Sequence, residues 1–134
     1  MTPSAADRLD ILEVVTRADE AASRRDADGY VALFALDAVL DGTQGRHSGR
    51  AELRASVGPI WATEGPATLH LTLNPVLELG PSDDQAVARS VLLIIDAAQP
   101  PALRTVALIT QELRRAERSW LITRRTVAPP AGLG

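Results

Sequence analysis

The sequence contains no cysteine and no lysine, and it is poor in aromatic residues. Without a thiol, the chain cannot form disulfides, thiolate zinc sites or a cysteine nucleophile. All 14 basic residues are arginines, so a lysine Schiff base or a lysine nucleophile is excluded as well. Because aromatic residues make up only 3% of the chain, the core and the walls of any pocket must be mainly aliphatic.

The sequence also shows no pattern typical of a targeting segment, a membrane span or a nucleic-acid-binding stretch. The N-terminal residues lack the basic and then apolar pattern of a signal peptide, and no apolar run reaches the roughly 20 residues of a membrane span. The net charge of −3 argues against a nucleic-acid partner, and the pairs Arg114-Arg115 and Arg124-Arg125 are expected to be solvated charges beside strands. The composition therefore predicts a cytoplasmic protein with no nucleic-acid and no membrane partner.

The chain has 134 residues, a length that suits one domain able to bury about two-thirds of its unfolded surface. No linker or internal repeat divides it. We expect a single domain over residues 1–128, followed by a disordered tail over residues 129–134.

The first third of the sequence has the periodicity of helices. Apolar residues recur at every third or fourth position, which predicts an amphipathic helix that starts within the first four residues and ends near Arg25. Asp26 is expected to cap a second helix, which contains Tyr30, Leu33 and Phe34.

Shorter elements are predicted in the segment that follows. Residues 39–41 are typical of a short strand and residues 42–49 of a loop. A third helix is expected over residues 50–57, with Trp61 also facing inward.

The second half of the chain contains strands joined by short turns, which favour antiparallel hairpins. The four expected strands span residues 68–79, 85–97, 103–114 and 119–127. Helices followed by an antiparallel sheet predict an α+β fold with the helices packed on one face of the sheet.

The first of these strands alternates strictly between apolar and polar residues, as a strand between two different environments does. Its polar face carries His70, Thr72 and Asn74, and we interpret this face as the wall of a small-molecule pocket. The next strand is apolar on both faces, with Leu92 and Ile94 on one of them. Three short helices can cover only one face of the sheet, so we expect a homodimer through the other.

Four phrases of the sequence, taken in order, resemble the SnoaL-like branch of the nuclear transport factor 2-like superfamily. They are DADGYVALF at 26–34, DAVLD at 37–41, GRAEL at 49–53 and LHLTLNP at 69–75. The resemblance implies a cone-shaped domain, in which N-terminal helices pack on a curved, mostly antiparallel sheet around a deep apolar pocket. Members include dehydratases, ketosteroid isomerases, polyketide cyclases, epoxide hydrolases and non-catalytic binding domains, so the fold does not assign the chemistry.

The catalytic patterns of these subfamilies are retained only in part. The resemblance to scytalone dehydratase places a catalytic histidine at His70, but the other positions of that pattern fall at Ser23, Gly42 and Asp96. The three acid and tyrosine positions of ketosteroid isomerase fall at Ala18, Gly42 and about Gln111. The epoxide hydrolase set keeps at most Arg89.

His70 is the first candidate for a catalytic residue, because an imidazole can take and return a proton near neutral pH. The alternative is a structural histidine that is hydrogen-bonded to Thr72 or to a neighbouring strand. Asp96 and Asp41 are candidate assisting acids, although each is also explained as a turn residue at a strand end. The candidate substrate-binding residues are Tyr30, Trp61, Thr72, Asn74, Leu92 and Ile94.

No metal site and no cofactor are expected, since His47 lies in a glycine-rich loop, where we expect it to be exposed, far from His70 in the sequence. Two functions follow from these residues. The first is a cofactor-independent lyase, isomerase or cyclase that performs a proton transfer on a small hydrophobic molecule. The alternative is a non-catalytic ligand-binding or dimeric interaction module of the same fold.

Overall fold

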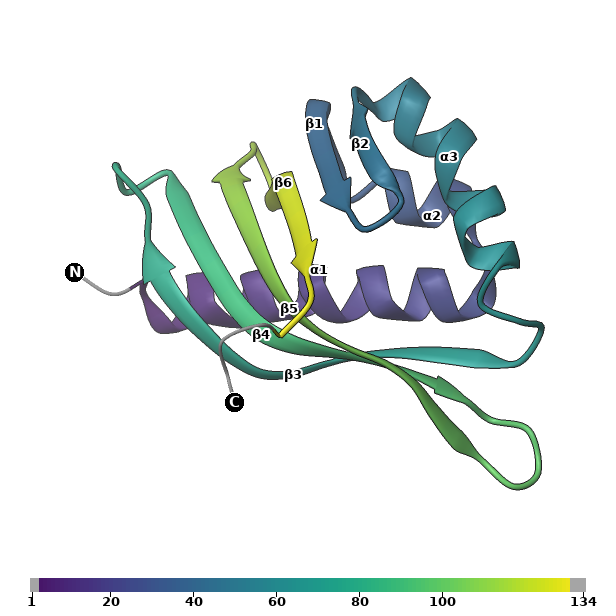
Figure 1. Ribbon diagram of the computed structural model, residues 1–134. Helices are drawn as coiled ribbons and strands as arrows, with labels where there is room; N and C mark the ends of the chain where they lie inside the picture. The colour runs from purple at the N-terminus through teal and green to yellow at the C-terminus, as the bar shows by residue number, and fades with distance from the viewer. Residues whose placement is uncertain (1–2, 131–134) are drawn as a thin grey trace.

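A computed structural model describes residues 3–130 as three helices and six strands (Figure 1). The helices are α1 (Ala5–Arg24), α2 (Ala27–Val31) and α3 (Arg50–Ala62). The strands are β1 (Phe34–Gly42), β2 (Gly45–Ser48), β3 (Thr68–Leu79), β4 (Gln85–Asp96), β5 (Ala102–Arg115) and β6 (Trp120–Ala128).

The strands form one curved sheet with the order β2-β1-β6-β5-β4-β3. Only β1 and β6 pair in parallel, and all the other neighbours are antiparallel. Figure 1 shows α1 running across the concave side of the sheet, with α3 beside β1 and β2 at the wide end. The predicted α+β cone with N-terminal helices on a mostly antiparallel sheet is confirmed.

Helix α1 begins at the N-cap Ser4, whose hydroxyl accepts a hydrogen bond from the backbone N–H of Asp7 at 3.1 Å. It ends at Arg25, which takes a left-handed conformation with φ 60°. The apolar stripe of the helix, which includes Ile11, Val14, Ala18 and Ala22, is buried against the sheet.

Two polar residues of α1 attach the helix to the edge strand β3. The Asp19 carboxylate accepts the backbone N–H of Thr72 at 2.7 Å, and the Ser23 hydroxyl accepts that of His70 at 2.9 Å. Four residues of helix rise by about 6 Å and two residues of strand by about 6.6 Å, so the two spacings match. The contacts satisfy backbone donors of an edge strand that would otherwise lack partners.

The core is divided into two apolar clusters. The larger joins the three helices to β1 and to one end of the other strands, and it includes Phe34, Leu53 and Trp120. The smaller consists of Leu92, Ile94, Ala107 and Ile109 on β4 and β5, with Val127 of β6 packed against it.

Three local predictions are corrected by the structure. Leu33 and Phe34 do not belong to α2, because Phe34 pairs with Ile122 of β6, whose N–H donates to the Leu33 carbonyl at 2.9 Å. The predicted loop over residues 42–49 contains strand β2, which forms a hairpin with β1. Helix α3 continues past Val57 to Ala62 and so carries the buried Trp61.

The predicted chain end lies partly beyond the structure. Residues 131–134 of the expected tail are outside the described residues, and β6 extends to Ala128. A domain boundary at residue 128 stays a prediction.

We expect the pairing of Asp7 with Arg115, which joins the start of α1 to β5, to make stability depend on pH. The Arg115 guanidinium donates to both Asp7 oxygens, at 2.8 and 3.0 Å, and these hydrogen bonds lower the pKa of Asp7 from 3.8 to about 2. A lowered pKa stabilises the folded state above pH 3.8, and this contribution is lost as the pH falls toward 2. Asp7→Asn should therefore lower the melting temperature at pH 6, by a difference that shrinks below pH 4.

Thermal unfolding of both proteins between pH 6 and pH 3 measures this effect. Asp10→Asn, at an exposed position on the same helix, serves as the control and should leave the curve unchanged. A constant difference between wild type and Asp7→Asn over this range would contradict the prediction.

Candidate functional site

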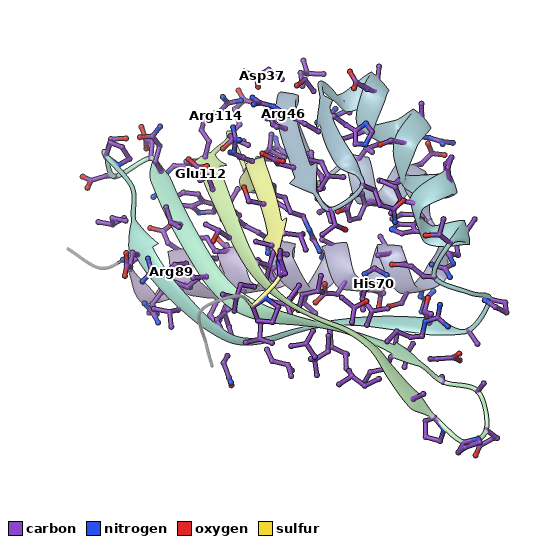
Figure 2. All side chains as sticks on the ribbon, in the orientation of Figure 1. Asp37, Arg46, His70, Arg89, Glu112 and Arg114 are labelled. Atoms are coloured by element: carbon purple, nitrogen blue, oxygen red, sulfur yellow. The ribbon has the colours of Figure 1, made fainter. Side chains whose placement is uncertain are left out.

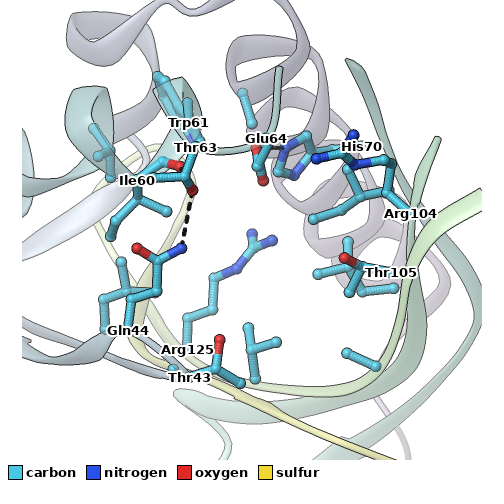
Figure 3. A pocket seen from close by; sticks show the side chains of 18 of the residues that line it. Thr43, Gln44, Ile60, Trp61, Thr63, Glu64, His70, Arg104, Thr105 and Arg125 are labelled. Carbon is cyan, nitrogen blue, oxygen red and sulfur yellow. Dashed lines mark hydrogen bonds and ion pairs between the residues drawn. The ribbon is translucent and has the colours of Figure 1, made fainter. Parts of the chain in front are cut away.

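A cavity of about 430 Å³ opens between the two apolar clusters, within the range of small-molecule sites. Its aliphatic wall is formed by Leu92, Ile94, Ala107 and Val127, and the facing wall by residues of α1, α2 and α3. Figure 3 shows the side chains around it, with Thr43 and Gln44 of the β1–β2 turn on one side and His70, Arg104 and Thr105 on the other.

His70 lies in the wall of this cavity on β3 and is only 7% exposed. Its Nε2 atom lies 2.8 Å from the Oε1 atom of Glu64 (Figure 3). The backbone N–H of His70 donates to Ser23 on α1, so the strand position that carries the imidazole is held from the helix side. The histidine therefore has an acidic partner that also lines the cavity.

Glu64 follows the C-terminal end of α3, where its own N–H donates to the Trp61 carbonyl at 3.0 Å. Its Oε1 atom lies 3.5 Å from Nη1 of Arg25. Arg25 in turn donates to the Thr68 hydroxyl at 2.9 Å and to the Gly65 carbonyl. The left-handed residue that ends α1 thus supplies a counter-charge to the carboxylate and fixes the loop that carries it.

The geometry of this pair selects one form of the neutral imidazole. A carboxylate can only accept hydrogen bonds, so we expect the proton of a neutral imidazole on His70 Nε2 and the lone pair on Nδ1. A histidine oriented by a carboxylate in this way is the usual arrangement of a general base, because the carboxylate also stabilises the imidazolium that forms.

An aromatic corner is formed by Tyr30 and Trp61, which both line the cavity. Their ring centroids are 5.2 Å apart in an edge-to-face arrangement, which is favourable for aromatic pairs. Burial raises the pKa of the Tyr30 hydroxyl above its ordinary value. Tyr30 is therefore an uncharged hydroxyl at neutral pH and can donate a hydrogen bond.

Arg125 on β6 lines the cavity although it is only 3% exposed, and its Nη1 atom has no hydrogen-bond partner among the described residues. This corrects the prediction that Arg124 and Arg125 are both solvated. The pairing of β5 and β6 shifts register between Glu112 and Leu113, which turns Arg125 inward and leaves Arg124 on the other face.

Five of the nine predicted site residues line the cavity. They are Tyr30, Trp61, His70, Leu92 and Ile94. The other four, Asp41, Thr72, Asn74 and Asp96, are not part of the cavity lining. The binding or catalytic role of each of the nine residues stays a prediction.

Each of the four has another environment. Asp41 accepts a hydrogen bond from Arg124 at 3.1 Å, and Thr72 is bonded to Asp19. Asn74 is exposed at a register shift of β3, with φ 55°. Asp96 accepts the N–H of Ala98 at 3.0 Å in the turn after β4.

The structure also shows where three other residues named in the sequence analysis lie. His47, expected to be exposed, is half-buried on β2 and lines the cavity. Arg89 donates to Glu78 at 3.0 Å on the surface, far from His70 (Figure 2). Gln111 is fully buried opposite Arg125. No group of three metal-ligating side chains is present within residues 3–130.

Sequence reasoning missed Glu64 and Arg125. Glu64 lies in the turn before β3, where nothing in the sequence shows that the chain folds back on His70. Arg125 could have been found as a charged residue on the inward face of a strand. The register shift in β6 changes which residues face inward, so simple alternation from Trp120 places Arg125 on the wrong face.

Comparisons with known proteins agree on one fold. A family model described as a SnoaL-like domain matches residues 3–126. The chain is similar to a protein of unknown function with a cystatin-like fold from Nostoc punctiforme, with a TM-score of 0.87 and 24% identity over 98% of this chain and 97% of that one. It is also similar to ActVI-ORFA from Streptomyces coelicolor, with a TM-score of 0.80 and 21% identity over 90% of this chain and 95% of that one.

A further similar structure is a protein of the NTF2-like family from Streptomyces avermitilis that is provisionally described as a dehydratase. It has a TM-score of 0.79 and 17% identity over 94% of this chain and 98% of that one. No curated protein matches the sequence significantly. In the described part of the chain, no helix combines the length and the apolar character needed to cross a membrane.

We expect NMR to show that Glu64 selects the tautomer of His70. Long-range ¹⁵N–¹H spectra of the wild type above neutral pH should place the His70 proton on Nε2. In Glu64→Gln the tautomers should mix, because an amide both donates and accepts. Glu52→Gln, beside His47, is the control and should leave the His70 signals in place. A wild-type His70 that is protonated on Nδ1 would refute this geometry.

Proposed function

This chain belongs to the SnoaL-like domain family of the NTF2-like superfamily, and on this basis we propose that it is an enzyme that performs a proton transfer on a small hydrophobic molecule held in the cavity. The reaction class is a dehydration, an isomerisation or a cyclisation. Each of these can proceed with acid and base groups alone, so the proposal includes no cofactor.

One observation carries the proposal, namely the 2.8 Å contact between His70 and Glu64 in the wall of the cavity. In the proposed reaction His70 Nδ1 takes a proton from a carbon that is acidified by a neighbouring carbonyl group, and it later returns the proton. Glu64 holds the imidazole in the required tautomer and stabilises the imidazolium.

The remaining walls suit a molecule with an apolar body. Leu92 and Ile94 offer aliphatic surface, and the Tyr30–Trp61 corner offers flat aromatic surface. The Tyr30 hydroxyl can donate to a carbonyl or hydroxyl oxygen of the substrate.

A non-catalytic ligand-binding module is the second candidate. Ser23 occupies the position where the family resemblance expects a catalytic aspartate, and its hydroxyl is already engaged with the His70 backbone. Glu64 is likewise engaged with Arg25. This candidate predicts binding without turnover, which the following experiment separates from catalysis.

We expect His70→Gln to lower kcat/KM by about 10²- to 10⁴-fold, the usual range for loss of a general base, and Glu64→Gln to lower it less. Substrates come from a panel of steroids, aromatic polyketides and terpenoid hydroxy-ketones, chosen by the rise in melting temperature that a bound ligand causes. Glu20→Gln, exposed on α1, is the control and should keep full activity.

Unchanged turnover in His70→Gln would end the enzymatic assignment to this residue. Ligands that raise the melting temperature without being converted by the wild type would favour the binding module.

We also propose that the protein forms a homodimer through the outer face of the sheet, defined as the face of β3, β4 and β5 opposite α1. Cross-strand register aligns nine apolar residues there in three rows. The rows are Leu69–Ile95–Leu103, Leu71–Leu93–Val106 and Leu73–Val91–Leu108. Leu103, Leu69 and Val106 are 58%, 45% and 42% exposed, an apolar patch that a second copy would remove from water.

We expect Leu71→Glu to convert the dimer to a monomer, because the charge would be buried without a partner at the interface. Sedimentation velocity at micromolar concentration measures this. Leu36→Glu replaces a leucine that is 75% exposed on β1 and should leave the dimer intact. A monomeric wild type would refute the proposed interface.

The proposed partner of the cavity is a small hydrophobic molecule. The cytoplasmic location and the lack of nucleic-acid and membrane partners stay predictions that rest on the sequence.

A further inference from the structure

Arg125 is a buried charge without a counter-ion at contact distance. Its side chain extends from β6 into the cavity (Figure 3), and it is 3% exposed. No carboxylate of the described residues lies within the 4.0 Å of an ion pair with it, and its closest aromatic contact is the Tyr30 ring, 5.7 Å from its Cζ. A guanidinium stays protonated in proteins, so the charge persists.

Such a charge is unfavourable unless an anion compensates it. The charge of Arg125 acts on the carboxyl group of Asp19 and lowers its pKa, but the two form no ion pair, and both Asp19 oxygens accept hydrogen bonds from Thr72. Burial is the largest effect on the pKa of Asp19 and raises it, so the same desolvation that acts on Arg125 also acts on this carboxyl group.

Arg125 is part of a polar belt that crosses the concave side of the sheet between the two apolar clusters. The belt consists of Ser90, Gln111 and Arg125. Gln111 lies directly opposite Arg125, and its two amide atoms and the Ser90 hydroxyl have no hydrogen-bond partner among residues 3–130. Unpartnered buried polar groups are rare in proteins and call for an explanation, and of these three residues Arg125 is the one that lines the cavity.

We propose that Arg125 binds the carboxylate group of the molecule that occupies the cavity. The ligand class is then an apolar ring or chain that carries one carboxylate. This inference rests on the proposed function of the cavity as a small-molecule site. One buried guanidinium compensates one negative charge, so a monoanion fits better than a phosphate dianion, and the planar guanidinium matches a carboxylate with two parallel hydrogen bonds.

The placement also orients the ligand. In this proposal the carboxylate contacts the Arg125 guanidinium and the apolar body lies along Leu92 and Ile94, which line the same cavity.

Isothermal titration with a matched pair of ligands tests the proposal. The probes are 2-naphthoate and its uncharged analogue 2-naphthamide, together with thermal-shift titrations of acetate and benzoate. Wild type should bind naphthoate on the order of 10- to 100-fold more tightly than naphthamide, as expected for hydrogen bonds to a charged group. Arg125→Gln should abolish this preference.

Arg124→Gln is the matched control. It removes the same charge from the neighbouring residue, which faces Asp41 on the other side of the sheet, and it should keep the preference. Equal affinity of the acid and the amide in wild type would overturn the proposal. So would an unchanged preference in Arg125→Gln, or the absence of any response to all three carboxylates.

The ligand-free variant gives an independent readout. If the role of Arg125 is to bind a ligand anion, Arg125→Gln should keep or raise the melting temperature of the ligand-free protein, because the substitution removes a buried uncompensated charge. A fall of more than about 10 °C would show a structural role and overturn the proposal. His70→Gln should keep the acid preference, so a failure of the proposed catalysis is distinguishable from a failure of carboxylate binding.

Discussion

The attachment of α1 to the edge strand β3 determines how the rest of the molecule is arranged. Asp19 and Ser23, one helical turn apart, accept the backbone donors of Thr72 and His70. The contacts close one edge of the sheet and fix the distance between helix and strand. The helix lies on the concave side of the sheet, and the cavity opens beside its C-terminal end, where Ala22 contributes to the lining.

The cavity requires a compromise between stability and chemistry. A continuous core would join the two apolar clusters, but Glu64, His70 and Arg125 lie in the space between them instead. Buried polar groups of this kind weaken packing unless they are paired. Glu64 and His70 are paired with each other, whereas Arg125 is not, and this difference separates the proposed catalytic group from the proposed ligand anchor.

The sequence predicted the local elements best where one pattern dominates. The alternation of apolar and polar residues predicted the limits of β3 correctly. Asp26 caps α2 as expected, by accepting a hydrogen bond from the Gly29 N–H at 2.9 Å. Predictions were wrong where tertiary pairing overrides local preference. Phe34 leaves the helical segment to pair with β6, and Gly45 allows the turn of an unexpected hairpin through its φ of 108°.

The sequence by itself determined the α+β class, the inward direction of His70 and the absence of thiol and lysine chemistry, because these depend on periodicity and composition. Only the tertiary structure decided which charges meet in the cavity. Glu64 reaches His70 through a loop closure, and Arg125 turns inward through a register shift of β6. The first depends on the contacts of Arg25, at the end of the distant α1, with Glu64 and Gly65, and the second on the pairing of two strands. A local sequence pattern encodes neither.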